Sequence, residues 1–409
     1  ETGSTTSRPF YQPVPLRQLA GRRFHPMRRT AMHDWHAQHD AQFYHAGDWY
    51  RPEYYRRAGV QRDECIVQEA QQVRASLGII DVSTLGKILV NGPDAVKLLE
   101  RLYTGRFKKL AIGRYRYGVA LDESGVVIED GVIARLAEDR FYVTATSGGA
   151  SAFYREMLRW ASIWGLDVTL SNVTSQLAAL NLAGPHSREA LAGLTDIDLS
   201  AHAFPYLGVR EGEVCGVRSL VMRVGFVGEL GYEVHVPAGE GEHVWQAIFA
   251  AGKRWEIGPF GVEAQRMLRL EKGHLIVGHD TDALTDPFEA GLAGTIGKNK
   301  PFFIGQRSLR VYADRERKRV LVGVRWPAGF KDRLPEECNL ILRAGRIVGR
   351  ITSIAAVATL GYPLAMAFVE PDMAESGTRL EVRLDDGSTS VAEVAQLPFY
   401  DPDDARQGL

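Results

Sequence analysis

A change of residue pattern near position 318 constrains the fold of this chain more than any other feature. Before it, strand-like and helix-like stretches alternate. After it, residues 320–400 are almost entirely strand-like, with the stretches VLVGVRW, NLILRAGRIVGRITS, AMAFVE and RLEVRL. A charged run, Ala313–Arg319 (ADRERKR), separates the two parts, and we interpret it as a solvated linker. We therefore place a domain boundary near residue 318 and expect a small all-β domain over residues 318–409.

Residues 63–317 are predicted to form an α+β region. Strands joined by short turns such as DESG are typical of antiparallel sheets, in contrast to a doubly wound parallel fold. Apolar spacing predicts helices over Glu64–Leu77, Asp94–Leu102, Ala150–Trp164, Glu242–Gly252 and Gly258–Gly273. Alternating patterns predict strands over Tyr115–Leu121, Val126–Arg135, Arg140–Thr146, Leu177–Leu182, Val217–Val224 and Gly231–Val236.

Residues 1–62 form an arm that is rich in arginine, histidine and aromatic side chains. The arm holds ten arginines, five acidic residues and five of the eleven histidines. Its five prolines and its lack of clear periodicity predict no regular elements. The arm either wraps over its own body or docks a partner, because arginine and aromatic residues are favoured at interface hot spots. His33, His36 and His39 lack a carboxylate pattern, so we expect no metal site there.

Composition excludes several classes of protein. Lys+Arg is 49 and Asp+Glu is 50, which argues against nucleic-acid binding. Cys65, Cys215 and Cys338 form no CxxC pair, which excludes a disulfide scaffold and favours a reducing, cytoplasmic compartment. We expect no membrane span, because no apolar run reaches about 18 residues. The first residue is Glu and no secretory signal follows it, so we expect a processed or excised piece of a longer chain.

The usual cofactor and catalytic motifs are missing from the sequence. It contains no GxGxxG after a strand, no GxxxxGK[ST], no HExxH and no GxSxG. We therefore expect no flavin, nicotinamide or nucleotide chemistry within this chain.

Three polar segments are candidate sites, and each has a plainer interpretation. In VVIEDGVIA, Glu129 and Asp130 interrupt an apolar strand, and one of them must face the same side as Val132. A carboxylate among apolar residues has a tunable pKa, which suits it to act as a base or to stabilise charge. The alternative, which the local pattern favours, is an edge strand with both acids in solvent.

The second segment is RVGFVGELGYEVHV, in which Glu229 lies in a turn before a strand. A carboxylate there can accept two N–H groups of a flat heterocycle, or it can be a solvated turn residue. The third segment is GHDTDALTDPFEAGL, where Asp280 and Asp282 could bind a metal. Its spacing does not match an EF-hand loop, and the alternative is a long surface connection.

Taken in order, these segments resemble the folate-dependent aminomethyltransferase family, which includes the glycine cleavage T-protein and the folate domains of sarcosine- and dimethylglycine-oxidising enzymes. The resemblance covers about residues 64–405. The matching segments are DESGVVIEDGVIAR, NLAGPHSREAL, GFVGELGYEVHVP, MLRLEKG, DPFEAGL, KPFFIGQ, GRITSIAAVATLGYPLAMAFV and LPFYDP. The resemblance implies the T-protein-like folate-binding fold with a C-terminal β-barrel. The arm is similar to the segment that joins the two halves of the α subunit of heterotetrameric sarcosine oxidases.

The resemblance carries roles to individual residues. Asp130 falls on the family's acidic catalytic position and Glu229 on its pterin-contacting glutamate, with Gly228, Tyr232 and Arg223 as further cofactor-binding residues. The T-protein usually has an arginine at the place of Gln265, with Arg266 next in this chain, so an arginine contact to folate is not carried over. The KGC motif of the related iron–sulfur repair proteins is replaced here by Lys-Gly-His at 272–274.

The function implied is transfer of a one-carbon unit to tetrahydrofolate. An N-methyl amine would be oxidised at FAD or FMN on partner subunits of a hetero-oligomer, and its one-carbon unit would be captured as 5,10-methylenetetrahydrofolate. One alternative is a stand-alone aminomethyltransferase, or an O- or S-demethylase of the same fold. Another is a scaffold subunit of an amine or imino-acid dehydrogenase complex with a vestigial folate site.

Overall fold

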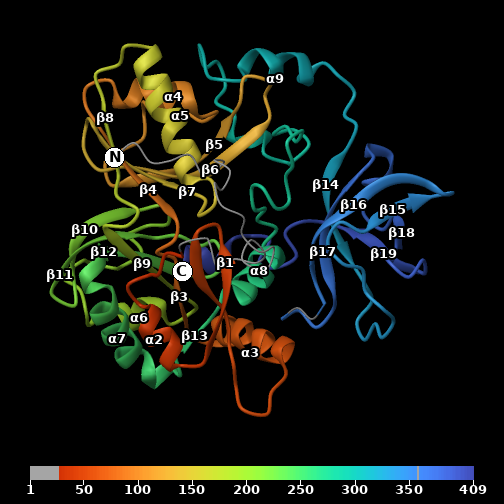
Figure 1. Cartoon of the computed structure of the whole chain (residues 1–409), viewed down its shortest axis with the longest axis horizontal. Helices are drawn as coiled ribbons and strands as arrows, with labels where there is room; N and C mark the ends of the chain where they lie inside the picture. The colour runs from red at the N-terminus through yellow and green to blue at the C-terminus, as the bar shows by residue number, and fades with distance from the viewer. Residues whose placement is uncertain (1–26, 357–358) are drawn as a thin grey trace, which may run out of the picture.

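The computed structural model describes residues 27–356 and 359–409 and places a closed barrel at one side of an α+β body (Figure 1). The body holds a six-stranded sheet, a five-stranded sheet and a two-stranded hairpin, and the barrel has six strands. Antiparallel sheets covered by helices and followed by a barrel were predicted from the sequence, and the structure confirms this fold class. The first 26 residues of the arm, with His25, and residues 357–358 lie outside the described part of the chain.

The six-stranded sheet has the order β10-β11-β12-β9-β3-β13. Its pairs are antiparallel except for β13 with β3. In chain order its strands are β3 (Gly78–Asp81), β9 (Leu177–Ala183), β10 (Val209–Val214), β11 (Val217–Met222), β12 (Gly231–Pro237) and β13 (Gly258–Pro259).

The five-stranded sheet has the order β5-β6-β7-β4-β8 and is antiparallel throughout. Hydrogen bonds join it to the larger sheet: the Tyr142 hydroxyl meets Nδ1 of His235 at 2.9 Å, and Arg140 donates to Glu211 at 2.7 Å. The Tyr115 hydroxyl donates to the carbonyl of Arg223, which follows β11, at 2.9 Å. The strands are β4 (Gly86–Asn91), β5 (Arg114–Leu121), β6 (Val127–Arg135), β7 (Arg140–Ala145) and β8 (Thr169–Asn172).

Helices cover the outer faces of both sheets. Short 3₁₀ segments lie at Ala238–Glu240, Lys253–Trp255, Ala293–Thr295 and Pro371–Met373. The α-helices of the described residues are α2 (His33–Gln38), α3 (Arg62–Ala75), α4 (Ala95–Leu102), α5 (Ala150–Ile163), α6 (Ser187–Ala192), α7 (Gly241–Gly252), α8 (Val262–Glu271), α9 (Gln306–Ala313) and α10 (Ala405–Gly408).

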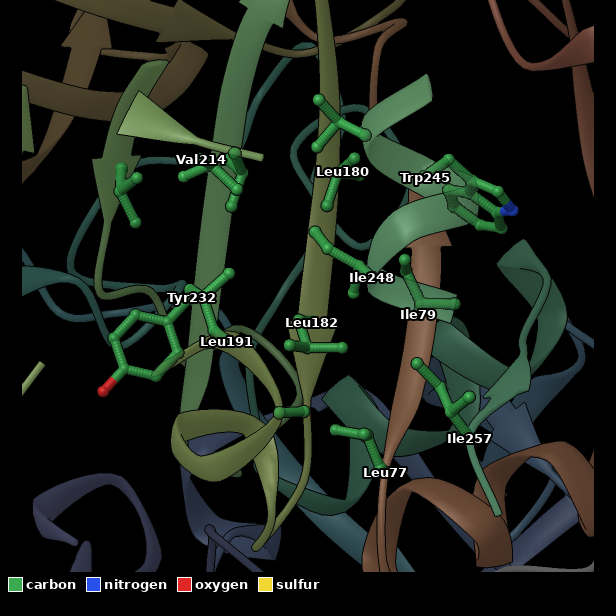
Figure 2. Close-up of a cluster of buried hydrophobic side chains, with 14 of the residues drawn as sticks. Leu77, Ile79, Leu180, Leu182, Leu191, Val214, Tyr232, Trp245, Ile248 and Ile257 are labelled. Atoms are coloured by element: carbon green, nitrogen blue, oxygen red, sulfur yellow. The ribbon is translucent and has the colours of Figure 1, made fainter. Parts of the chain in front are cut away.

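The largest apolar cluster lies between the six-stranded sheet and helices α6 and α7. Figure 2 shows Leu180 and Leu182 of β9 facing Ile248 of α7, with Tyr232 of β12 at the edge of the cluster. These side chains lie on one face of each strand because successive strand residues point to opposite sides. Burial of this apolar surface supplies most of the stabilisation of this half of the body.

The barrel closes in the strand order β14-β17-β16-β15-β18-β19. Closure leaves no unpaired edge strand, which is how a small all-β domain avoids edge-to-edge association. Its strands are β14 (Val320–Arg325), β15 (Leu340–Arg343), β16 (Arg346–Ala355), β17 (Leu364–Val369), β18 (Arg379–Arg383) and β19 (Thr389–Ala395). Residues 313–318 of the charged run are exposed before β14, as expected of a linker.

The arm contradicts the expectation that it lacks regular elements. Its described part contains α2 and a hairpin of β1 (Ala41–Ala46) and β2 (Trp49–Tyr55). The hairpin turns at Gly47, whose φ of 59° glycine adopts without strain. Tertiary contacts stabilise the short helix: Trp35 meets Trp245 edge to face at 5.1 Å. This part of the arm therefore wraps over its own body.

One predicted helix is too long. Residues Gly258–Gly273 were expected to form a single helix, but Gly258–Pro259 is a short strand that pairs with β3, and α8 begins only at Val262. Proline lacks the N–H group that a helix interior requires, and Gly261 takes extended geometry as the residue before α8. The other predicted strands and helices of the body differ from the observed ones by only a few residues at their ends.

Candidate active site

Strand β6 sends its two adjacent acids to opposite faces of the five-stranded sheet. Asp130 pairs with Val119 and lies two residues from Val132, on the face that looks toward the larger sheet. β6 lies inside the sheet, between β5 and β7, so the edge-strand interpretation is wrong. The next residue, Gly131, has no room for a side chain, because a Cβ there would lie 2.0 Å from the carbonyl oxygen of Thr144 on β7.

Asp130 is partly exposed and has one neutral hydrogen-bond donor. The Tyr117 hydroxyl of β5 donates to its Oδ2 at 2.8 Å. Removal of the carboxyl from water raises the pKa of Asp130 to about 6, and the bond from Tyr117 opposes that rise. An acid with this pKa is ionised at neutral pH and can exchange a proton near it, as a general base or a charge stabiliser requires.

Glu129 is buried on the helix side of the same sheet. Its Oε1 accepts the backbone N–H groups of Asp130 and Thr146, each at 3.0 Å, and its Oε2 accepts the Thr146 hydroxyl at 3.0 Å. Burial raises the pKa of Glu129 to about 8, and the bonds from Thr146 oppose the rise. Among the residues described, no lysine or arginine pairs with this carboxyl.

Glu229 lies in the segment between β11 and β12, directly after a tight turn. The N–H of Gly228 donates to the carbonyl of Gly225 at 2.9 Å, and Gly228 has a φ of 82°, which favours glycine. The turn directs Glu229 inward, and its side chain is fully buried. A solvated turn acid, the plainer interpretation of the sequence, is therefore wrong.

One oxygen of the Glu229 carboxylate is held by two donors. Arg74 of α3 donates to Oε1 through Nη1 at 3.1 Å, and the Tyr400 hydroxyl donates to the same oxygen at 2.5 Å. The other oxygen, Oε2, is buried without a hydrogen-bond partner in the described chain. Burial raises the pKa of Glu229, and the donors Tyr400 and Arg74 oppose that rise. This orphaned acceptor fits a ligand that presents an N–H group.

Arg74 links this carboxylate to a second buried acid. Its Nη2 donates to Oε2 of Glu271 at 2.8 Å, and its guanidinium lies 3.8 Å from the centre of the Tyr400 ring. Oε1 of Glu271 accepts the backbone N–H and the hydroxyl of Thr359 at 2.6 and 2.7 Å. Helix α3, helix α8 and the segment after the barrel thus converge on Glu229.

The other residues assigned to the cofactor are engaged with the protein itself. A Cβ at Gly228 would lie 3.0 Å from Cδ of Lys272, so Gly228 packs against that side chain. Arg223 is buried and donates to the carbonyls of Phe204 and Gln407, each at 2.9 Å. Tyr232 is buried beside Phe204, with its hydroxyl close to the Leu199 carbonyl. Their direct contacts with folate stay predictions.

The structure does not join the two principal acids directly. No hydrogen bond or ion pair of the described residues connects Asp130 with Glu229 or with the side chains around it. Asp130 lies on the smaller sheet and Glu229 on the turn of the larger one. A ligand that meets both must therefore span the two sheets.

The third candidate segment is structural. Asp280 is fully buried and accepts from Arg269 at 2.5 Å and from Thr352 of the barrel at 2.8 Å. Asp282 pairs with Arg319 at 2.8 Å and with Arg350 at 3.0 Å. These pairs fasten the body to the barrel, and within residues 27–356 and 359–409 no cluster of metal-ligating side chains occurs. Arg266 follows Gln265, the position where the T-protein usually has an arginine. It also pairs with a barrel residue, Glu337, at 2.6 Å.

Sequence reasoning missed Arg74, Tyr400 and Glu271 as neighbours of Glu229. They lie in three segments that were recognised separately: the helix predicted at Glu64–Leu77, LPFYDP and MLRLEKG. No local signal reports that they meet. Among the described helices, none has the length and apolar content needed to cross a bilayer.

The fold and the site define a class of protein: an α+β body carrying two inward acids, followed by a small barrel. The family model of the GCVT N-terminal domain matches residues 32–300, and that of the glycine cleavage T-protein C-terminal barrel domain matches residues 319–401. The chain belongs to the glycine cleavage T-protein family of folate-dependent aminomethyltransferases. The crystal structure of the glycine cleavage system aminomethyltransferase T from Bartonella henselae is similar over 91% of this chain and 98% of that one, with a TM-score of 0.81 and 25% identity.

Curated relatives include sarcosine oxidase alpha subunits and aminomethyltransferases. The sarcosine oxidase subunit alpha of Corynebacterium sp. (strain U-96) is 37% identical over 100% of this chain and 44% of its own length. That of Rhizobium meliloti is 34% identical over 99% of this chain and 43% of its own length. The aminomethyltransferase of Saccharopolyspora erythraea is 31% identical over 91% of this chain and 98% of its own length. The chain thus spans less than half of the alpha subunits that it matches.

Proposed function

We propose that the chain is the tetrahydrofolate-binding one-carbon transferase part of a sarcosine oxidase-like flavoenzyme complex in the cytoplasm. It would capture the one-carbon unit of an oxidised N-methyl amine as 5,10-methylenetetrahydrofolate. Family membership supports the transferase chemistry. The match to the sarcosine oxidase alpha subunits, which extends over the whole chain, supports the complex.

The observation that carries the proposal is the orphaned Oε2 of Glu229. Arg74 and Tyr400 fix the carboxylate through Oε1, so Oε2 is left as an acceptor of fixed position. The pterin ring of tetrahydrofolate presents an amino group and a ring N–H on one edge. A buried carboxylate oxygen without a partner is costly. A donor that forms a charge-assisted hydrogen bond to it removes this cost and is therefore bound favourably.

Asp130 is the residue proposed to act on the reacting atoms. Tetrahydrofolate supplies the amine nitrogens that accept the one-carbon unit. The Asp130 carboxylate would take up a proton from the reacting amine, or stabilise positive charge that develops during transfer. Tyr117 orients this carboxylate through its bond to Oδ2. The pKa of about 6 leaves Asp130 ionised at neutral pH.

The oxidation step is assigned to partner subunits. We infer that FAD or FMN lies on those subunits and that residues 1–62 contribute to docking them. In residues 27–62 the arm already packs on the body, so docking by this part would use the face that points away from it.

Calorimetric titration with tetrahydrofolate tests the site, first on the chain and then on the assembled complex. Glu229→Gln keeps the size and one acceptor but places an amide donor where Oε2 lies. We expect one-to-one binding that this variant weakens at least tenfold, while the barrel variant Glu370→Gln, whose partners are Arg343 and Arg346, binds like the wild type. Wild-type affinity of Glu229→Gln in the complex, with an unchanged melting profile, would exclude Glu229 as the pterin contact.

A stand-alone aminomethyltransferase is the second candidate, because the aminomethyltransferases of Saccharopolyspora erythraea and Streptomyces coelicolor align over 98% of their own length. Purification of the native complex separates the two functions. Co-elution of the chain with flavin absorbance supports the flavoenzyme complex, and elution without flavin supports the stand-alone enzyme. A scaffold with a vestigial site predicts assembly with flavin subunits but no tetrahydrofolate binding.

A further inference from the structure

The orphaned oxygen of Glu229 faces a cation that does not bond to it. Nε of Arg406 lies 4.0 Å from Oε2, too far for a hydrogen bond, and it donates instead to the Tyr400 hydroxyl at 3.1 Å. The Arg406 side chain is 42% exposed, whereas Glu229 is fully buried. Arg406 therefore reaches solvent, whereas the free acceptor beside it does not.

The backbone that carries Arg406 is anchored on both sides. Before it, Lys272 donates to the Asp401 carbonyl at 2.5 Å and pairs with Asp404 at 2.6 Å. After it, the buried Gln407 donates to the Gly225 carbonyl at 3.1 Å, and Arg223 donates to the Gln407 carbonyl at 2.9 Å. The main chain is thus held while the arginine side chain is half in solvent. Rotation of the Arg406 side chain would therefore move the guanidinium away from Glu229 without disturbing the main chain.

We propose that Arg406 is a specificity-determining residue that competes with the ligand for Oε2 of Glu229. The inference rests on the proposed function, because it takes the ligand to be the pterin edge of tetrahydrofolate. A guanidinium and that edge present the same pattern, paired N–H donors in one plane, which suits a carboxylate. The ligand therefore binds by displacing an internal group that resembles it.

Competition of this kind selects among ligands. With Arg406 close to the carboxylate, the free state of the site already has part of the electrostatic stabilisation that a ligand would supply. A ligand with one weak donor gains too little to displace the guanidinium. A ligand that brings its N–H donors to Oε2, the oxygen that Arg74 and Tyr400 leave free, replaces the long contact of 4.0 Å by direct hydrogen bonds.

Calorimetric titration of the assembled complex with tetrahydrofolate tests the competition. Arg406→Met removes the donor fork and keeps an unbranched side chain of similar length. We expect it to bind tetrahydrofolate about three- to tenfold more tightly than the wild type. Arg379→Met, in the exposed part of β18, also removes one positive charge but lies in the barrel, and it is expected to leave the affinity unchanged.

A double variant makes the test specific. In the Glu229→Gln background the gain from Arg406→Met should vanish, because the acceptor for which Arg406 competes is gone. Unchanged or weaker binding by Arg406→Met would overturn the inference, and weaker binding would make Arg406 a ligand contact instead. Failure of the proposed function gives another pattern, in which Glu229→Gln itself binds tetrahydrofolate like the wild type.

Discussion

Arg74 and Glu229 lie 155 positions apart in the sequence and meet in a buried ion pair at 3.1 Å. The same guanidinium reaches Glu271 at 2.8 Å, so one arginine serves two buried carboxylates. A buried ion pair stabilises a fold only when close contact and further hydrogen bonds offset the cost of removing both charges from water. The pair therefore ties the position of Glu229 to the packing of α3 against α8.

Arg74→Met is expected to destabilise the protein by about 3–5 kcal/mol, because Glu229 and Glu271 would stay buried without their cation. Urea denaturation at neutral pH measures the loss. Arg379→Met on the barrel surface is the control and should change the free energy of unfolding by less than about 0.5 kcal/mol. A loss below about 1 kcal/mol for Arg74→Met would show that the two acids find other partners.

Glu129 is expected to make stability depend on pH. Its pKa is about 8 in the folded protein and near 4.5 in the unfolded chain. Between those values the unfolded chain has released the proton that the folded protein keeps. Stability contributed by this group is thus complete below pH 4.5 and falls by about 1.4 kcal/mol per pH unit until it levels off above pH 8.

The Glu129→Gln variant removes this dependence, so its stability relative to the wild type should rise steadily across that window. Chemical denaturation at several pH values between 5 and 9 measures the difference. Equal slopes for the wild type and the variant would mean that Glu129 is already ionised in the folded protein.

Tyr117→Phe is expected to shift the acid limb of the activity profile to higher pH. Activity that requires ionised Asp130 rises as pH passes through its pKa of about 6. Removing the hydroxyl removes a donor to the ionised form, so the pKa increases by roughly one pH unit. The pH profile of kcat/KM for methylenetetrahydrofolate formation by the complex measures it. Tyr312→Phe, whose hydroxyl bonds to Ser124 instead, is the control.

Asp130→Asn is expected to reduce methylenetetrahydrofolate formation by two or more orders of magnitude, the range typical of a lost general base. Assembly with the flavin subunits should be unaffected, because Asp130 bonds only to Tyr117 through its side chain and is partly exposed. Product formation at the wild-type rate would disprove the role assigned to Asp130. Loss of assembly would make it a structural residue.

Much of the site could be predicted locally because its residues lie in short, patterned segments. The alternation around Glu129 and Asp130 placed one acid on the side of Val132, and the structure has Asp130 there. The glycines around Glu229 indicated a turn, which the positive φ of Gly228 confirms. The arm was predicted poorly, because its helix and hairpin depend on contacts such as Trp35 with Trp245 more than on periodicity.

Local patterns predicted most strands and helices of residues 63–317 and the strand-rich domain after residue 318, because periodicity and turn residues are local properties. The resemblance of ordered segments implied the family and its C-terminal barrel. The burial of Glu229 and the partial exposure of Asp130 follow instead from how distant segments pack. Those states depend on Arg74 and Tyr400, which lie 155 and 171 positions from Glu229, and on the pairing of β5 with β6. Burial and pKa follow from which distant groups meet, and no local pattern encodes that.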